Sequence, residues 1–170
     1  MTVMTDTHTN ISRRNDMQFT PHEYQKYTID FIKTHPAAAA FLDCGLGKTV
    51  ICLTALKDLL EEGEISKVLV VAPLRVARDV WPIEAEKWSH LNGLKVSVVL
   101  GTPKQRRAAL EADAQIYVTN RDNVQWLVAQ KWPIYLFDTF LLHRDALAAF
   151  EAVFSEEEKQ DNSLYQLYNR

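Results

Sequence analysis

The chain has 170 residues, of which 47% are hydrophobic, 10% aromatic and 24% charged. This balance can build one well-covered core, so it excludes a largely disordered chain and favours a single domain. Nineteen Lys and Arg residues oppose 22 Asp and Glu residues, which gives a formal net charge of -3. The strong basic excess of a self-sufficient nucleic-acid-binding protein is therefore absent, and any contact with nucleic acid must be local.

The sequence shows no sign of export or membrane insertion. No apolar run reaches the roughly 18 to 20 residues needed to cross a bilayer, and the first residues lack the apolar stretch of a secretory signal. We therefore expect a cytoplasmic protein with no membrane partner. The cysteines Cys44 and Cys52 lack metal-site spacing, and we expect both to be buried small residues rather than a disulfide.

Composition divides the chain into three parts. Residues 1–16 are rich in Thr, Asn, Asp and Ser and nearly devoid of apolar side chains, which predicts a disordered N-terminal arm. Residues 17–154 carry the periodic apolar pattern of one folded lobe, and this pattern diverges after about residue 133. Residues 155–170 are expected to form a polar C-terminal tail.

Helical and strand patterns alternate through the folded part. The segment Thr20-Pro21-His22-Glu23 has the spacing of a capping box, so it predicts a helix that ends before Pro36. The apolar run over 37–42 is expected to be a strand, and a second, amphipathic helix follows after residue 49. Strands are expected at residues 67–73, 95–100, 115–119 and 133–138. Such alternation predicts an α/β fold, a three-layer parallel sheet with helices on both faces.

The segment Gly45-Leu46-Gly47-Lys48-Thr49 lies between the apolar run and the second helix, where a phosphate-binding loop is expected. The two glycines let the backbone curl so that successive N–H groups point inward, and the helix adds its positive end. Lys48 is expected to reach the β- and γ-phosphates of a nucleotide, and the Thr49 hydroxyl to bind the bridging Mg²⁺. The strict pattern asks for glycine where this chain has Leu42, so a glycine turn with an incidental lysine is the alternative.

Several motifs in a fixed order resemble those of helicase-like ATPases of superfamily two, specifically the compact Swi/Snf-type translocases of phages and bacteria. These motifs are TPHEYQ, DCGLGKT, VLVVAPLRVARDVW followed by EKW, and IYVTN. The resemblance covers roughly residues 19–132, most of the first of two RecA-like lobes in such enzymes. It implies a P-loop NTPase fold, a RecA-like lobe, with ATP or ADP and Mg²⁺ as cofactors. The residues around the nucleotide would be Cys44, Gly45, Leu46, Gly47, Lys48 and Thr49.

The resemblance also implies roles for residues outside the loop. Gln25 would read the edge of adenine, because an amide offers both a donor and an acceptor; its alternative is an exposed helix glutamine. The nucleic-acid backbone would be contacted by Arg75, Arg78, Thr119, Asn120 and Arg121. Hydroxyl, amide and guanidinium groups suit phosphates without carrying sequence information. For Arg75 and Arg78, solvated helix charges are the alternative.

The resemblance breaks where the family has an apolar strand ending in Asp-Glu, whose Asp organises Mg²⁺ and whose Glu activates water. Here Asp138 ends the expected strand 133–138 and is the candidate metal ligand and, with Lys48, the candidate catalytic residue. Thr139 stands in place of the glutamate and cannot accept a proton. Asp145 lies too far along the chain to substitute without a different local structure.

Together these features predict the ATP-binding lobe of a Swi/Snf-like helicase or DNA-dependent ATPase. It would be deficient in hydrolysis and translocation on its own, because the Asp-Glu motif and the second lobe are missing, and its status as an enzyme stays open. One alternative is a phage or mobile-element interaction module that inhibits or decoys a host protein. Another is one half of a split helicase, with the second lobe supplied by a separate chain. Contact of the lobe alone with a nucleic-acid backbone would be weak.

Overall fold

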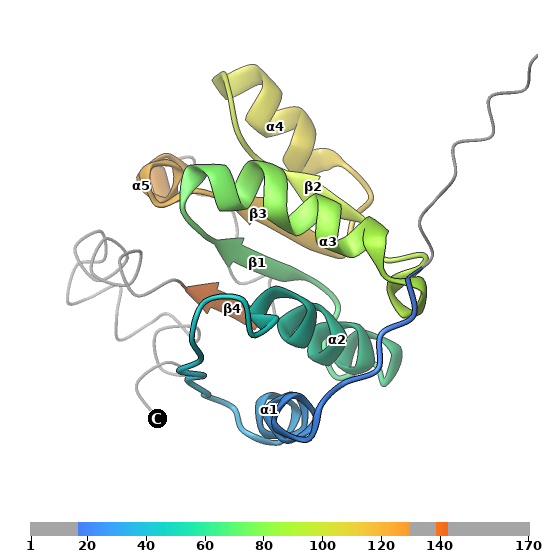
Figure 1. Ribbon diagram of the computed structural model, residues 1–170. Helices are drawn as coiled ribbons and strands as arrows, with labels where there is room; N and C mark the ends of the chain where they lie inside the picture. Colours follow the sequence, from blue (N-terminus) through green and yellow to red (C-terminus); the bar gives the residue numbers. More distant parts are fainter. Residues whose placement is uncertain (1–16, 130–138, 143–170) are drawn as a thin grey trace, which may run out of the picture.

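A computed structural model describes residues 17–129 and 139–142, and within these residues the centre of the fold is a parallel sheet (Figure 1). Its strands are β1 (Val68–Val71), β2 (Val96–Val98), β3 (Ile116–Thr119) and β4 (Thr139–Leu142). They lie in the order β2-β3-β1-β4, so β1 is central. Val68, the first residue of β1, is opposite Ile116 on one side and Thr139 on the other.

Two helices precede the first strand, and the others occupy the connections between the strands (Figure 1). They are α1 (Glu23–Thr34), α2 (Lys48–Glu61), α3 (Trp81–Lys87), α4 (Pro103–Glu111) and α5 (Arg121–Ala129). A short π-helical segment, η1 (Val76–Val80), runs directly into α3, and a 3-10 turn, η2 (Ser89–Leu91), follows it. No helix in the described part of the chain is long and apolar enough to span a bilayer.

The core lies on both faces of the sheet, because successive residues of a strand point to opposite sides. Leu69 and Val71 pack in one cluster with residues of α4 and α5. Val68 and Val70 pack in a second cluster with residues of α2, η1 and α3. All four β1 residues are buried, as expected for a strand covered on both faces. The predicted α/β fold with helices on both sides of a parallel sheet is confirmed.

Helix α1 adds a layer outside α2 (Figure 1). Ile29 of α1 packs with Ile51 and Ala55 of α2 in a small apolar cluster. Ion pairs reinforce this contact, since Lys33 Nζ lies 3.1 Å from Asp58 and 2.8 Å from Glu62. These contacts fix α1 beside the chain that leads into α2.

The expected capping box at the start of α1 is wrong by two residues. The helix begins at Glu23, and its N-cap residue is His22. Gln25 Oε1 accepts a hydrogen bond of 2.9 Å from the backbone N–H of His22, whereas Glu23 pairs with Lys26. The returning acceptor is thus Gln25 rather than Glu23, which moves the first turn two residues along the chain.

The first and the last of the expected strands differ from what the structure shows. Residues 37–42 form neither helix nor strand, and Phe41 is 92% exposed. The expected strand 133–138 lies outside the described residues, and the strand that pairs with β1 begins after it, at Thr139. The arm 1–16 and the tail 155–170 also lie outside the described residues, so these boundaries stay predictions.

Candidate phosphate-binding site

The loop that precedes α2 has the curl expected of an anion-binding segment. Gly45 and Gly47 have φ angles of 86° and 76°, in the left-handed region that glycine adopts at little cost. Gly47 is the N-cap residue of α2, and its carbonyl accepts the N–H of Ile51 at 3.0 Å. The amino end of a 14-residue helix therefore opens into the loop, where its unpaired amides favour a negative charge.

Lys48 spans this loop. Its Nζ donates to the carbonyl oxygens of Leu42 at 2.8 Å and Asp43 at 2.9 Å. A phosphate in the loop would offer charged oxygens in place of these neutral carbonyls, and hydrogen bonds between charged groups are stronger. Thr49 follows in the first turn of α2. The roles of Lys48 toward phosphate and of Thr49 toward Mg²⁺ stay predictions.

Gln25 is buried against the same loop, with only 6% of its surface exposed, which excludes the alternative of an exposed helix glutamine. Its Nε2 donates to the carbonyl of Leu46 at 3.3 Å, while its Oε1 accepts from His22. A Cβ at Gly47 would lie 2.8 Å from Nε2, so this contact requires glycine there. The two bonds use one donor and one acceptor of an amide that has two of each. Its reading of adenine stays a prediction.

Tyr24 also contacts the loop, although nothing in its sequence position indicated a role. Its hydroxyl donates to the carbonyl of Leu46 at 3.3 Å, the same oxygen that receives the amide of Gln25. Two consecutive residues of α1 thus bind one carbonyl in the middle of the loop. Only the docking of α1 on α2 brings them there, and that contact is not encoded in a local motif.

The two cysteines have different environments. Cys44 is exposed in the loop, so the expectation that it is buried is wrong. Cys52 of α2 is half-buried as a residue, but its sulfur is enclosed by the core, and burial raises the pKa of its thiol to about 11. Cys44 is consequently the accessible thiol of the loop, and Cys52 is an inert one.

The residues predicted to contact nucleic acid follow the carboxyl ends of β1 and β3, but they differ in exposure. Thr119 is fully buried and its hydroxyl donates to the carbonyl of Val99 at 2.8 Å, which leaves it no surface for a phosphate. Asn120 is 7% exposed; its Nδ2 donates to Asp122 at 3.0 Å, and its buried Oδ1 has no hydrogen-bond partner within the described residues. Arg121 is exposed and its Nε lies 3.6 Å from Asp122.

Arg75 directly precedes η1 and Arg78 lies within it, and both are exposed. Arg78 forms two hydrogen bonds with Asp79, at 2.8 and 2.9 Å. The hydrogen bond and charge of Asp79 raise the pKa of the Arg78 guanidinium. Arg75 adds to the positive charge at the same turn, since it is one of the charges that lower the pKa of the Asp79 carboxyl.

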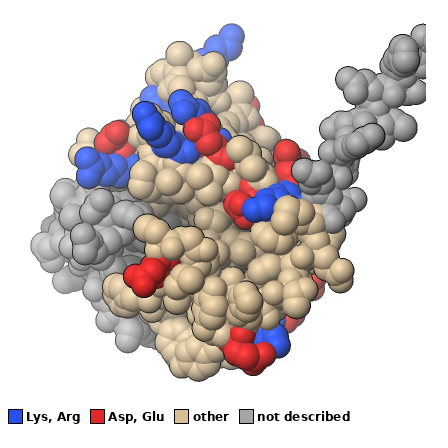
Figure 2. All heavy atoms as spheres, in the orientation of Figure 1, with Lys and Arg blue, Asp and Glu red and all other residues tan. Residues whose placement is uncertain are grey.

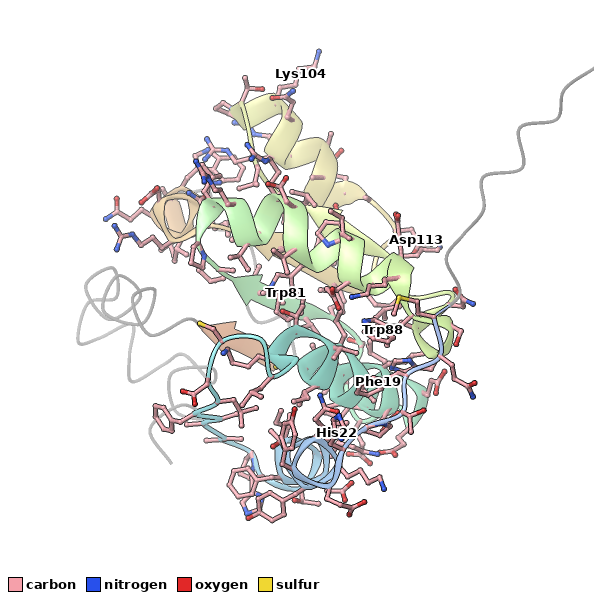
Figure 3. All side chains as sticks on the ribbon, viewed as in Figure 1. Phe19, His22, Trp81, Trp88, Lys104 and Asp113 are labelled. Atoms are coloured by element: carbon pink, nitrogen blue, oxygen red, sulfur yellow. The ribbon has the colours of Figure 1, made fainter. Side chains whose placement is uncertain are left out.

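Basic side chains gather at one end of the molecule, over the starts of η1, α4 and α5 (Figure 2). Lys104 projects from the start of α4 at this end (Figure 3). We call these residues the basic end: Arg75, Arg78, Lys104, Arg106, Arg107 and Arg121. Arg106 is half-buried, and its guanidinium lies 4.1 Å from the centre of the Trp126 ring. Because η1, α4 and α5 follow β1, β2 and β3, the basic end lies toward the carboxyl edge of the sheet. The loop before α2 (residues 43–49, the phosphate loop) lies toward the same edge, since α2 leads from it back to the start of β1 (Figure 1). Open parallel sheets bind their ligands at this edge.

Comparison with known proteins decides the family. Residues 36–159 match the SNF2-related domain. This chain belongs to the SNF2-related domain family. It is also 42% identical over 120 residues to the protein p41 of Acyrthosiphon pisum secondary endosymbiont phage 1. That match covers 68% of this chain and 26% of the phage protein, so the chain spans about a quarter of the length of that relative.

The family assignment confirms the resemblance that the motifs carried: the fold is a RecA-like lobe of the Swi/Snf type, and a phage relative is similar to it. Of the two residues predicted to contact Mg²⁺, Thr49 and Asp138, only Thr49 lies within the described residues. Asp138 lies outside the described residues, so its role stays a prediction. Residues 17–129 and 139–142 contain no cluster of three His, Cys, Asp or Glu side chains that could hold a metal ion.

Proposed function

We propose that this SNF2-related domain is the ATP-binding lobe of a helicase-like, nucleic-acid-dependent ATPase, and that the lobe alone hydrolyses little or no ATP. One observation carries the proposal. The loop before α2 curls at Gly45 and Gly47, Lys48 spans it, and Gln25 is buried against it. A helix N-terminus, an ammonium group and an amide side chain thereby meet in one place, which suits a triphosphate joined to a base.

Each residue of the loop has a defined task in this proposal. The backbone amides around Gly45 and Gly47 would bind the phosphate oxygens, and Lys48 would exchange its carbonyl partners for the β- and γ-phosphates. The Thr49 hydroxyl would contact Mg²⁺, which when bound neutralises the phosphate charge. Gln25 would use its remaining donor and acceptor on the adenine edge.

The register of β4 bears on the acid that would complete the metal site. Such an acid belongs at the carboxyl edge of the sheet, where the loop is, and β4 reaches this edge at Leu142. Asp138 precedes β4 in the chain and Asp145 follows it, and both are outside the described residues. We therefore expect Asp145→Asn, more than Asp138→Asn, to weaken the Mg²⁺ dependence of ATP binding.

Neither acid is followed by glutamate, since Thr139 and Ala146 come next. The absence of this glutamate supports slow hydrolysis.

The basic end supports weak contact with a nucleic-acid backbone. It brings six Lys and Arg side chains to the edge of the sheet that also carries the loop, in a chain of net charge -3. Arg75, Arg78 and Arg121 are exposed there and could bind phosphates, whereas Thr119 and Asn120 would support the chain from inside. Such contacts carry no base information, so binding would be non-specific.

Cys44 provides the test of ATP binding, because it is an exposed thiol within the loop. MgATP is expected to slow alkylation of Cys44 by iodoacetamide in the wild-type protein and not in Lys48→Ala. Lys57→Ala, on the same helix but nine residues beyond Lys48, is the control and should keep the protection. The proposal fails if millimolar MgATP protects neither protein, or if it protects wild type and Lys48→Ala equally.

A further inference from the structure

The carbonyl of Leu46 is an unusual point of contact between α1 and the phosphate loop. It accepts the Tyr24 hydroxyl and the Gln25 amide, each at 3.3 Å. Both donors come from the first turn of α1, and α1 itself is fixed to α2 by an apolar cluster and by the ion pairs of Lys33. The loop carbonyl is therefore held from outside by a helix that cannot easily move away.

Holding this carbonyl also sets the direction of the amide that follows it. In a trans peptide the C=O of Leu46 and the N–H of Gly47 point in opposite directions. When α1 holds the carbonyl on its side, the N–H of Gly47 turns to the other side, away from α1. Hydrogen bonds to the carbonyl also polarise the peptide and strengthen its N–H as a donor.

We propose that Tyr24 is a positioning residue of the phosphate loop, acting through the carbonyl of Leu46 to orient the N–H of Gly47 toward a bound phosphate. The proposal rests on the proposed function, in which this loop binds ATP. Gln25 alone would hold the 46–47 peptide by a single bond of 3.3 Å from a side chain that also bonds His22. Tyr24 doubles that restraint and has no part in reading the base.

The variant Tyr24→Phe tests this role, because it removes the hydroxyl and keeps the ring that stacks on His22 at 5.9 Å. Tyr27→Phe is the matched control, since Tyr27 lies on the same helix, is 70% exposed and stacks on Phe31 instead. In the protein without nucleotide, the amide ¹⁵N shift of Gly47 should move in Tyr24→Phe and stay in place in Tyr27→Phe. Thermal unfolding of both variants is the check that each is folded at the temperature of the measurement.

The second readout is nucleotide affinity, measured as the concentration that gives half protection of Cys44. Tyr24→Phe should weaken MgATP and MgGTP by the same factor, about three- to ten-fold, as expected for one hydrogen bond. Gln25→Ala should weaken MgATP more than MgGTP, and so reduce the preference for MgATP. An equal factor for both nucleotides separates positioning of the loop from recognition of the base.

The outcomes are distinct. An unchanged Gly47 shift overturns the role of Tyr24, and so does a changed shift with unchanged affinity, because the restraint would then not serve binding. If wild type binds no MgATP, the proposed function fails instead, and the Gly47 shift still decides whether the Tyr24 hydroxyl holds the loop.

Discussion

Gly47 and Gly63 have nearly the same backbone torsion, with φ angles of 76° and 75°, but different surroundings. A Cβ at Gly47 would lie 2.8 Å from Gln25 Nε2 and 3.3 Å from Val50 Cγ1, whereas nothing lies within 4 Å of one at Gly63. Both substitutions to alanine incur the strain of a left-handed residue, about 1 to 2 kcal/mol. Only the change at Gly47 also displaces Gln25 from the loop.

We therefore expect Gly47→Ala to lower the free energy of unfolding in urea more than Gly63→Ala does. Gly47→Ala should also abolish protection of Cys44 by MgATP, because Gln25 would no longer fit against the loop. Gly63→Ala should retain that protection. Equal losses of stability in the two variants would show that the close approach of Gln25 to Gly47 has no energetic weight.

The cysteines lead to a second expectation at this scale. A thiol pKa of about 11 leaves about one thousandth of Cys52 as thiolate at pH 8, and the thiolate is the reactive form. Iodoacetamide should label Cys44 in the native protein and Cys52 only after unfolding in urea, as read by mass spectrometry of peptides. Similar labelling rates for both cysteines in the native protein would contradict the burial of Cys52.

Individual residues of the site were predictable to the extent that their roles are local. The glycines, Lys48 and Thr49 lie within five consecutive residues, so their spacing alone indicated the candidate loop. Tyr24 was missed and Cys44 was misplaced because hydrogen bonding at Leu46 and exposure at the loop depend on how α1 packs. The burial of Thr119 likewise depends on the packing of β3 beside β2, where the Thr119 hydroxyl donates to the carbonyl of Val99.

Among the elements, the segment before α1 has the most contacts that the sequence did not indicate. Met17 forms a parallel bridge with Trp88, and its carbonyl accepts the N–H of Ser89 at 3.0 Å. The ring of Phe19 meets Trp88 edge to face at 5.3 Å (Figure 3). The same ring stacks on His90 at 5.1 Å. This segment therefore fastens the chain at the start of α1 to the connection between α3 and β2.

His90 makes that connection sensitive to pH. Its Nε2 lies 2.8 Å from the hydroxyl of Thr54, which itself donates to Val50, so Nε2 carries the proton. The buried Nδ1 has no hydrogen-bond partner within residues 17–129 and 139–142. Burial lowers the pKa of His90 below 6.5; the charge of nearby Asp58 opposes this shift and that of Lys57 adds to it. A second proton on the ring would be buried without an acceptor.

Because the unfolded chain binds this proton more readily than the folded chain, stability rises with pH up to about 6.5 and is lost as pH falls through the folded pKa. We expect the free energy of unfolding of wild type to drop between about pH 7.5 and about pH 5.5, and His90→Gln to show a smaller drop. Urea unfolding at both pH values measures the difference. Equal drops would assign the pH dependence to carboxylates elsewhere.

Elements with a strong local pattern were predicted closely. The strands at Val68–Val71, Val96–Val98 and Ile116–Thr119 lie within the expected ranges, because short β-branched runs between helical patterns rarely form anything else. The apolar run 37–42 was not a strand, since an apolar stretch does not by itself provide the neighbouring strand that it must pair with. The position of β4 was missed because apolar residues lie on both sides of Asp138 and Thr139, between residues 134 and 142, over a longer range than one strand occupies.

At the scale of the whole molecule, the net charge is negative, but one end of the surface is rich in positive side chains. The chain carries -3 overall, yet six Lys and Arg side chains gather over the starts of η1, α4 and α5. Each of these starts follows a parallel strand, so the topology itself collects the charges at the carboxyl edge that also carries the phosphate loop. Composition could exclude a globally basic protein, but only the strand order could show this asymmetry.

The asymmetry leads to an expectation for nucleic acid. Each phosphate neutralised by a side chain releases condensed counterions, so the logarithm of the association constant falls with the logarithm of salt by about 0.7 per contact for a single strand. Arg75→Ala and Lys104→Ala should each weaken binding to labelled oligothymidine and reduce that slope by about 0.7, as measured by fluorescence anisotropy at several NaCl concentrations. Lys26→Ala, on α1 and paired with Glu23, should leave the slope unchanged. If all three variants keep the wild-type slope, the basic end does not bind the phosphate backbone, and the proposal of a nucleic-acid contact is wrong.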